Sequence, residues 1–288
     1  MKLSAAELRV RAGQARAHYA RCDLCAHRCL VDRTHGPAGV CREDDGLWLA
    51  GAGVHFGEEP RLVPSGMVLI GGCNLACESC ETHQFSLERR GLVRTSGPQL
   101  ASLLLDLQAK GAANANFVTP THVLPALLDG LAIAAQHGFS LPVVWNCGGY
   151  ESVEALRLLD GVVDIYLPDA KYGDDLRALE LSGCKGYTAG LRESLAEMLR
   201  QVGPAGIIVR HLVLPEGVAA PEKLMPLIAA VSPDLCVNVM SQYRPVYRAA
   251  RLPVIARAVR PDEVRAAVKA ARSAGLQAVL VDGAKPAF

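Results

Sequence analysis

Three cysteines stand close together in the stretch from Gly71 to Cys80. They are Cys73, Cys77 and Cys80, with gaps of three and two residues between them. Thiolates are the usual protein ligands of iron–sulfur clusters, and three of them hold three irons of a [4Fe–4S] cluster. The fourth iron then has no ligand from this loop. An open iron suits a substrate or cofactor that must bind the metal, so the spacing predicts a cluster with a chemical role.

Zinc is the main alternative for this loop. Structural zinc normally takes four ligands, so a zinc site would need a fourth residue. His83, three residues after Cys80, could supply it. A ferredoxin-type run of four cysteines, which would fill every corner of the cluster, is absent here.

A second set of cysteines precedes the first. Its members are Cys22, Cys25, Cys29 and Cys41. Four thiolates in a short segment with a Gly-Pro turn predict a second metal site, with zinc and an auxiliary iron–sulfur cluster both open. Because four ligands close either kind of site, we expect a structural or electron-relay role. The alternative is a set of reduced thiols in a flexible segment.

Composition narrows the class of protein. The chain has 288 residues, ten cysteines and a formal net charge of +1. This charge predicts no general attraction to nucleic acid or membrane. We find no apolar run of about 18 residues that would span a bilayer, and no apolar signal core at the N-terminus. Ten cysteines without a signal peptide indicate a reducing compartment, so a cytoplasmic location with metal sites rather than disulfides is expected.

The first part of the chain lacks the pattern of a large core. Residues 3–20 predict an amphipathic helix, residues 21–45 a cysteine-rich segment, and residues 46–66 a connector rich in glycine and proline. We therefore expect a small cysteine-rich metal-binding extension over residues 1–60 and a main domain over residues 61–288.

From residue 67 onward, short apolar runs alternate with helical patterns. This alternation predicts an α/β fold with parallel strands and outer helices. We interpret it as a partial (β/α) barrel of about six parallel strands, with an open doubly wound sheet as the alternative. The expected strands are 67–72, 113–118, 142–146, 162–167, 207–213, 235–240 and 277–281, and the expected helices are 97–110, 122–138, 151–160, 188–202, 220–231 and 261–274.

Polar residues gather where most of the expected strands end. In barrel enzymes the active site forms at the carboxyl ends of the strands, so we expect these side chains to line one face with the cysteine loop. The candidates for cofactor binding are Asn116, Thr119, His122, Asn146, Asp169, Lys171, Arg210, His211 and Gln242. Plainer roles are also open: a surface ion pair for Asp169 with Lys171, a core histidine for His211, and a helix start for His122.

Several segments together resemble a known family. The chain looks like a radical S-adenosylmethionine (SAM) protein of the pyruvate formate-lyase activating-enzyme-like group, in its PflX-type branch. The segments that carry this resemblance are the two cysteine sets, Gly57-Glu58-Glu59-Pro60, Asn116 to His122, Asp164 to Tyr172, Arg210 to Pro215, and Asn238 to Tyr243.

The resemblance implies a cofactor set and a reaction. Cys73, Cys77 and Cys80 would bind a [4Fe–4S] cluster, and SAM would bind the fourth iron through its amino and carboxylate groups. An electron from the cluster would cleave SAM to methionine and a 5′-deoxyadenosyl radical, which abstracts a hydrogen atom. Such an oxidoreductase needs flavodoxin or ferredoxin as electron donor. The site is expected to be sensitive to oxygen.

The chain departs from the family pattern at four places. Ser79 stands where members often carry an aromatic residue, and Glu81-Thr82-His83 replaces Gln-Asn-aromatic. No Gly-Gly-Glu follows the second expected strand, and Cys147-Gly148-Gly149 stands where relatives more often show Thr-Ser-Gly. None of these changes removes a cluster ligand.

The resemblance leaves the substrate open. Our leading hypothesis is a glycyl-radical-enzyme activase, whose substrate is a backbone glycine of a partner protein; this rests on analogy. One alternative is radical modification of a peptide or small molecule. Another is a non-catalytic iron–sulfur redox sensor. A zinc-bound nucleic-acid adaptor is disfavoured, because the chain has no basic patch with interleaved aromatics.

Overall fold

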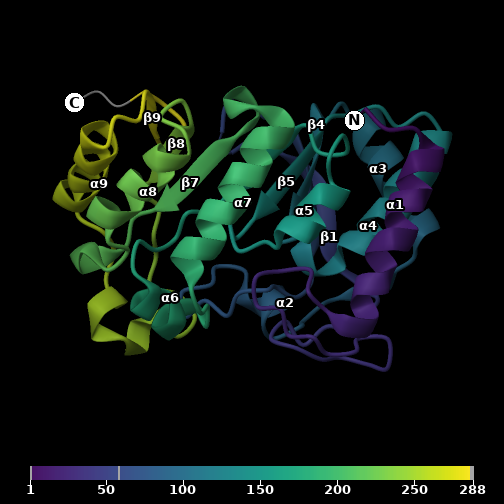
Figure 1. Cartoon of the computed structure of the whole chain (residues 1–288), viewed down its shortest axis with the longest axis horizontal. Helices are drawn as coiled ribbons and strands as arrows, with labels where there is room; N and C mark the ends of the chain where they lie inside the picture. Colours follow the sequence, from purple (N-terminus) through teal and green to yellow (C-terminus); the bar gives the residue numbers. More distant parts are fainter. Residues whose placement is uncertain (1, 58, 286–288) are drawn as a thin grey trace. The chain divides into compact units, whose positions relative to one another are not determined.

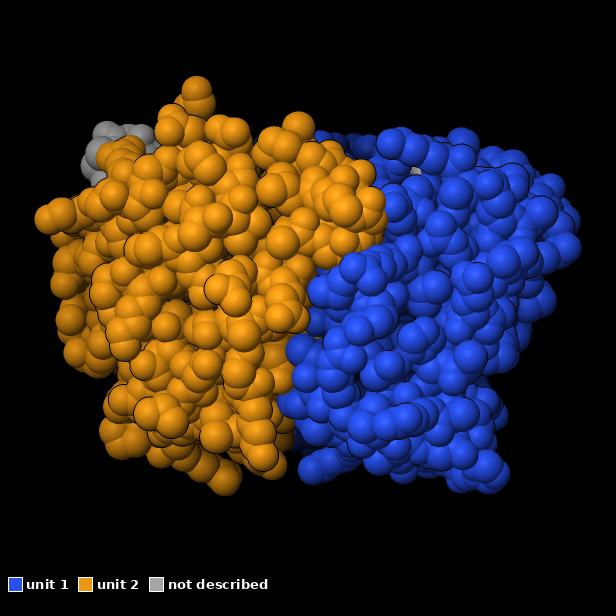
Figure 2. All heavy atoms as spheres, in the orientation of Figure 1, with its two compact units in different colours: residues 1–74, 84–147, 151–166 blue, residues 75–83, 148–150, 167–288 orange. Residues whose placement is uncertain are grey.

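The computed structural model describes residues 2–57 and 59–285. Glu58, part of the Gly57 to Pro60 motif, lies outside the described residues. The chain divides into two compact units, coloured separately in Figure 2. Unit 1 comprises residues 1–74, 84–147 and 151–166, and unit 2 comprises residues 75–83, 148–150 and 167–288. The loop from Cys73 to Cys80 therefore starts in unit 1 and continues into unit 2.

A six-stranded sheet is built mainly from unit 1, in the order β3-β1-β2-β4-β5-β6. Its strands are β1 (Leu47–His55), β2 (Ser65–Ile70), β3 (Val93–Thr95), β4 (Asn114–Val118), β5 (Val143–Cys147) and β6 (Ile165–Pro168). β2, β4 and β5 run parallel, whereas β1 pairs antiparallel with both β2 and β3. Every residue of β5 is buried, as expected for a parallel strand covered on both faces.

Helices cover the sheet of unit 1, and their starts have sequence signals. The helices are α1 (Ala5–Ala17), α2 (His83–Ser86), α3 (Gly97–Ala109), α4 (Leu124–Gln136) and α5 (Val153–Leu158). Ser4 and Ser96 form capping boxes with Glu7 and Gln99, which satisfy free N–H groups at the starts of α1 and α3. α4 packs against both α1 and α3, and all three lie on the right of Figure 1.

Unit 2 has its own parallel sheet, in the order β7-β8-β9. The strands are β7 (Ile208–Leu212), β8 (Cys236–Met240) and β9 (Ala278–Val281), and the helices are α6 (Asp175–Ser182), α7 (Tyr187–Val202), α8 (Pro221–Val231) and α9 (Pro261–Ser273). In α6, the carboxylate of Asp174 accepts from two backbone N–H groups at the start, and Gly183 ends the helix at φ +70°. α8 packs against both α7 and α9 (Figure 1).

Short 3₁₀ helices lie in the connections. They are η1 (His18–Arg21), η2 (Thr121–Val123), η3 (Pro204–Gly206), η4 (Pro215–Gly217), η5 (Ala249–Arg251) and η6 (Pro253–Ile255). Among the described residues, no helix is both long enough and apolar enough to cross a membrane.

The seven strands expected from the sequence are all present, as are the expected helices, with ends shifted by a few residues. The expectation of a plain connector over residues 46–66 was wrong, because this segment contains β1. The part of β1 after Leu49 is glycine-rich and partly exposed. It therefore lacks the alternation of apolar and polar side chains by which a strand is recognised in a sequence. α6 was also missed, since eight residues are too few for a clear helical period.

Candidate functional site

The cysteine loop begins directly after β2, at Gly71 and Gly72. His122 Nε2 lies 2.8 Å from the carbonyl oxygen of Gly71, and the Thr119 hydroxyl donates to the carbonyl oxygen of Gly72 at 3.3 Å. Gly72 has φ +79°, and a Cβ there would lie 2.4 Å from Glu43 Oε1. The chain thus reaches the first cysteine through a turn that requires glycine and that two of the predicted site residues hold.

The other predicted residues of unit 1 lie on the neighbouring strands. Asn116 on β4 donates from Nδ2 to the Ser65 hydroxyl at 3.2 Å, while its Oδ1 is buried without a partner among the described residues. Asn146 on β5 is buried, and its carbonyl oxygen accepts from the Thr119 N–H at 2.9 Å. The structure therefore groups Thr119 and Asn146 at the carboxyl ends of adjacent parallel strands.

Two buried groups in unit 1 have shifted pKa values. Burial, and then the nearby Arg33 guanidinium, lower the pKa of His122 to about 3, so the imidazole is neutral. Burial raises the pKa of Glu151 to about 7, although hydrogen bonds from Thr121 and other neighbours oppose this. The Thr121 hydroxyl donates to Glu151 Oε2 at 2.6 Å.

The second half of the cysteine loop lies in unit 2, against the end of α6. The N–H groups of Ala76 and Glu78 donate to the carbonyl oxygens of Ser182 and Leu181, at 3.1 and 2.8 Å. These carbonyls belong to the last turn of the helix, where they have no partner within the helix. The helix end thereby fixes the backbone on both sides of Cys77.

A chain of two hydrogen bonds ends on the sulfur of Cys77. The Ser182 hydroxyl donates to Cys77 Sγ at 3.1 Å. Because its proton is used in this bond, Ser182 accepts from the Tyr172 hydroxyl, 2.8 Å away. Ser182 is fully buried and Tyr172 nearly so. We call these two residues the Tyr172–Ser182 relay.

A half-buried ion pair lies near the same sulfur. Lys171 Nζ is 2.7 Å from Asp169 Oδ2. Burial lowers the pKa of Lys171, but the charges of Asp169 and Cys77 raise it more, so the ammonium stays charged. Burial raises the pKa of the Cys80 thiol, and negative charge on Cys77 raises it further. A metal that binds Cys80 must therefore displace its proton.

Strand β7 places two more predicted residues beside this pair. The carbonyl oxygen of Arg210 accepts from the Ala170 N–H at 2.7 Å, and His211 Nδ1 lies 2.9 Å from the Ala170 carbonyl oxygen. His211 is fully buried, and burial lowers its pKa. Its Nε2 has no partner among the described residues. Gln242, in contrast, is exposed.

The structure explains two of the departures from the family pattern. The Ser79 side chain hydrogen-bonds to the Tyr243 hydroxyl, whose pKa burial raises to about 12. His83 Nδ1 lies 3.0 Å from the Cys80 carbonyl oxygen, and its ring stacks on Tyr247 at 4.8 Å between centroids. His83 is thus engaged with the backbone and an aromatic ring rather than with a thiol.

The N-terminal cysteines gather around one small cavity in unit 1. Its lining includes Cys22, Cys25, Cys29 and Cys41 together with Arg33 and His122. In the described part of the chain, no three His, Cys, Asp or Glu side chains are grouped closely enough to ligate a metal. The assignment of either cysteine set to a metal therefore stays a prediction.

The donors around Cys77 fit an iron–sulfur cluster. Cluster sulfurs and thiolates carry negative charge and accept hydrogen bonds, and such bonds tune the reduction potential. Unit 2 offers two donors near this sulfur, the half-buried ammonium of Lys171 and the hydroxyl of Ser182. Cys77 and Cys80 are only partly buried, so a metal can reach them.

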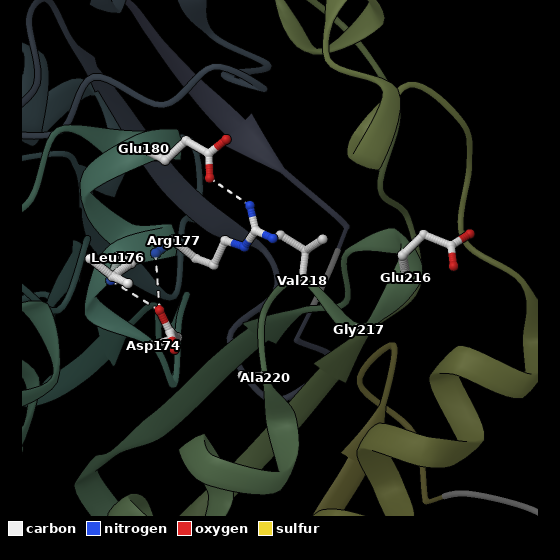
Figure 3. A pocket seen from close by; sticks show the side chains of 8 residues that line it. All are labelled: Asp174, Leu176, Arg177, Glu180, Glu216, Gly217, Val218 and Ala220. Atoms are coloured by element: carbon white, nitrogen blue, oxygen red, sulfur yellow. Dashed lines mark hydrogen bonds and ion pairs between the residues drawn. The ribbon is translucent and has the colours of Figure 1, made fainter.

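A separate surface pocket of about 510 Å³ lies in unit 2 (Figure 3). It is lined by Asp174, Leu176, Arg177, Glu180, Glu216, Gly217, Val218 and Ala220. None of these is a predicted site residue, and Arg177 and Glu180 already form an ion pair at 2.6 Å. The open pocket is therefore not the place where the predicted chemistry resides.

Comparison with known proteins first defines the fold. A solved structure of a radical SAM methyltransferase from Sphaerobacter thermophilus superposes with a TM-score of 0.55 at 15% identity, covering 97% of this chain and 93% of that one. The chain thus has the α/β fold of that protein. It is also 32% identical over 269 residues to the uncharacterized protein MJ0674 of Methanocaldococcus jannaschii, covering 91% of this chain and 77% of the relative. The chain belongs to the family of MJ0674. No protein-family model matches it.

Sequence reasoning missed Tyr172 and Ser182 as functional candidates. Ser182 lies in a helix that the sequence did not reveal, far along the chain from Cys77. Arg33 was also missed, although an arginine among cysteines in an otherwise polar segment was a usable signal. Its near-complete burial is known only from the fold.

Proposed function

We propose that this protein is a radical SAM enzyme whose cluster is held by Cys73, Cys77 and Cys80. The cysteine spacing carries this proposal, and the fold shared with a radical SAM methyltransferase supports it. When bound, the cluster and SAM supply a 5′-deoxyadenosyl radical that abstracts a hydrogen atom.

The chain's own residues have defined tasks in this proposal. Gly72 and its partners set the turn into the loop, and the end of α6 fixes the backbone beside Cys77. Lys171 and the Tyr172–Ser182 relay offset negative charge at the thiolates. The remaining polar residues at the strand ends are proposed to bind SAM: Asn116, Thr119, His122, Asn146, Asp169, Arg210, His211 and Gln242.

The finer proposal is an activase that acts on a backbone glycine of a partner glycyl radical enzyme. In this proposal flavodoxin or ferredoxin is the electron donor, and the detailed fold is a partial (β/α) barrel. Modification of a peptide or small molecule by the same radical is the alternative within this class. The resemblance to activating enzymes supports the first choice.

A non-catalytic redox sensor is the second candidate. It is favoured by Ser79, whose side chain is engaged by Tyr243, and by the absence of a Gly-Gly-Glu segment. A sensor would keep the cluster without binding SAM.

Electron paramagnetic resonance separates the two candidates. The protein is reconstituted anaerobically, reduced with dithionite, and measured with and without SAM, with Cys80→Ala as the cluster-free control. A radical SAM enzyme is expected to show a changed cluster spectrum on SAM addition, because SAM binds the open iron. An unchanged spectrum from a fully loaded cluster would favour the sensor.

A further inference from the structure

Arg33 is a buried cation in unit 1, with only 1% of its surface exposed. Its Nε donates to the Glu43 carbonyl oxygen at 3.0 Å, and its two terminal nitrogens donate to the carbonyl oxygens of His122 and Asp44 at 2.7 and 2.5 Å. Its guanidinium also stacks over the Tyr19 ring at 4.7 Å. All these partners are neutral.

No carboxylate pairs directly with this cation. Within residues 2–57 and 59–285, Arg33 forms no ion pair with an Asp or Glu side chain, and the nearby Glu43 carboxylate, which also feels the charge of Arg33, is paired with Arg89. One carboxylate therefore serves two cations. A buried charge without a counter-ion is strongly unfavourable. A fold that holds Arg33 so firmly should therefore supply negative charge nearby.

Thiols are the acidic groups that face Arg33. One terminal nitrogen lies 3.7 Å from Cys22 Sγ. The same cavity is lined by Cys22, Cys25, Cys29 and Cys41. As neutral thiols these groups balance no charge, but as metal-bound thiolates they would.

The backbone around these cysteines is shaped to bring them together. The Arg28 N–H donates to the Cys25 carbonyl oxygen, and the Arg42 N–H donates to the Gly39 carbonyl oxygen, so a tight turn lies at each end of the segment. Arg28 and Arg42 have φ of +43° and +58°, which non-glycine residues rarely adopt. Such strain persists only where the surrounding structure compensates for it.

Four cysteine thiolates form a complete ligand set for structural zinc. As the side chains stand, the cavity that these cysteines line has a volume of about 10 Å³, close to the room needed by one water-sized atom. We infer that Cys22, Cys25, Cys29 and Cys41 bind one zinc ion, with Arg33 as the buried counter-charge.

Charge and protons balance in this site. Four thiols lose their protons to solvent on binding, and a zinc ion with four thiolates carries a formal charge of about −2. The Arg33 guanidinium offsets part of that charge. Since no three thiols converge in the described structure, the side chains must rotate inward when zinc binds.

Metal analysis of the full chain tests this inference independently of SAM chemistry. A Cys73→Ala/Cys77→Ala/Cys80→Ala variant removes the predicted cluster and is purified without added metal. We expect roughly one zinc per chain, retained when Cys236→Ala is added as a control and lost when Cys25→Ser is added. Absence of zinc, or iron with acid-labile sulfide that Cys25→Ser removes, would overturn the inference.

Cobalt titration tests the role of Arg33. Zinc is replaced by Co²⁺ in the same three-alanine background, and intense thiolate-to-cobalt absorption is expected. Arg33→Gln should weaken Co²⁺ binding about 10–100-fold, as loss of an outer-shell partner does, while circular dichroism checks that the variant is folded. If that variant does not fold, the cobalt spectrum of the three-alanine protein with Arg33 intact tests by itself whether the four thiolates bind the metal. Weak absorption without thiolate character, or equal affinity in folded Arg33→Gln, would refute the inference.

Discussion

The Tyr172–Ser182 relay makes a sharp prediction about stability. Ser182→Ala removes two hydrogen bonds and leaves the Tyr172 hydroxyl buried without a partner. A buried polar group left unpaired costs about 1–3 kcal/mol. Tyr172→Phe removes one bond but leaves Ser182 free to donate to Cys77, so we expect a cost of about 0.5–1.5 kcal/mol.

The double variant distinguishes a relay from two independent contacts. In Ser182→Ala/Tyr172→Phe the phenol is gone, so no orphaned hydroxyl remains. We expect its loss of stability to be smaller than the sum of the two single losses by about 1 kcal/mol. Urea unfolding of the four proteins, followed anaerobically by circular dichroism, measures this coupling. Additive losses within about 0.3 kcal/mol would refute the relay.

The relay should also affect the cluster. A hydrogen bond to a cluster ligand stabilises the reduced, more negative state. Ser182→Ala should therefore lower the midpoint potential of the reconstituted cluster, measured by redox titration with equal iron content in both proteins. An unchanged potential would show that the Ser182 hydroxyl does not reach the ligand sulfur once the metal is bound.

Three further predictions concern buried backbone and histidine positions. Gly72→Ala should lower the free energy of unfolding by about 2 kcal/mol, because it combines a left-handed φ with a clash against Glu43. A variant as stable as the wild type in urea unfolding would contradict the requirement for glycine in this turn. Gly149→Ala should destabilise similarly in thermal unfolding, since its Cβ would lie 2.4 Å from the Asp169 carbonyl oxygen at φ +71°, and an unchanged melting temperature would contradict this. In the folded protein His122 has a pKa of about 3, against 6.5 for the ordinary group. The stability that the neutral imidazole contributes is therefore complete above about pH 6.5 and is lost as the pH falls toward 3. The stability difference between wild type and His122→Gln should shrink by about 2 kcal/mol from about pH 7.5 to pH 5 in urea unfolding, whereas a constant difference would mean that His122 is not buried neutral.

Much of the fold could be predicted from the sequence because parallel strands are continuous apolar runs. β5 and β8 were visible for this reason. β1 escaped notice because the glycines in its second half break the alternation. The antiparallel pairing of β1 with β2 is also non-local information, which no short window contains.

The candidate site was predictable only in part. The spacing of Cys73, Cys77 and Cys80 indicates metal chemistry, because the ligands come from one short loop. The residues that tune such a loop come from distant segments. Ser182 and Lys171 reach Cys77 through the packing of α6 and the segment after β6, and no local pattern encodes that proximity.

Formation of 5′-deoxyadenosine tests the central claim most directly. The protein is reconstituted anaerobically with iron and sulfide, supplied with SAM and dithionite, and assayed for the nucleoside by mass spectrometry. Cys77→Ala serves as the negative control and Cys236→Ala as the matched cysteine control. We expect product from wild type and Cys236→Ala, and only background from Cys77→Ala. A wild-type protein with a fully loaded cluster that forms no more product than Cys77→Ala would contradict the proposed function.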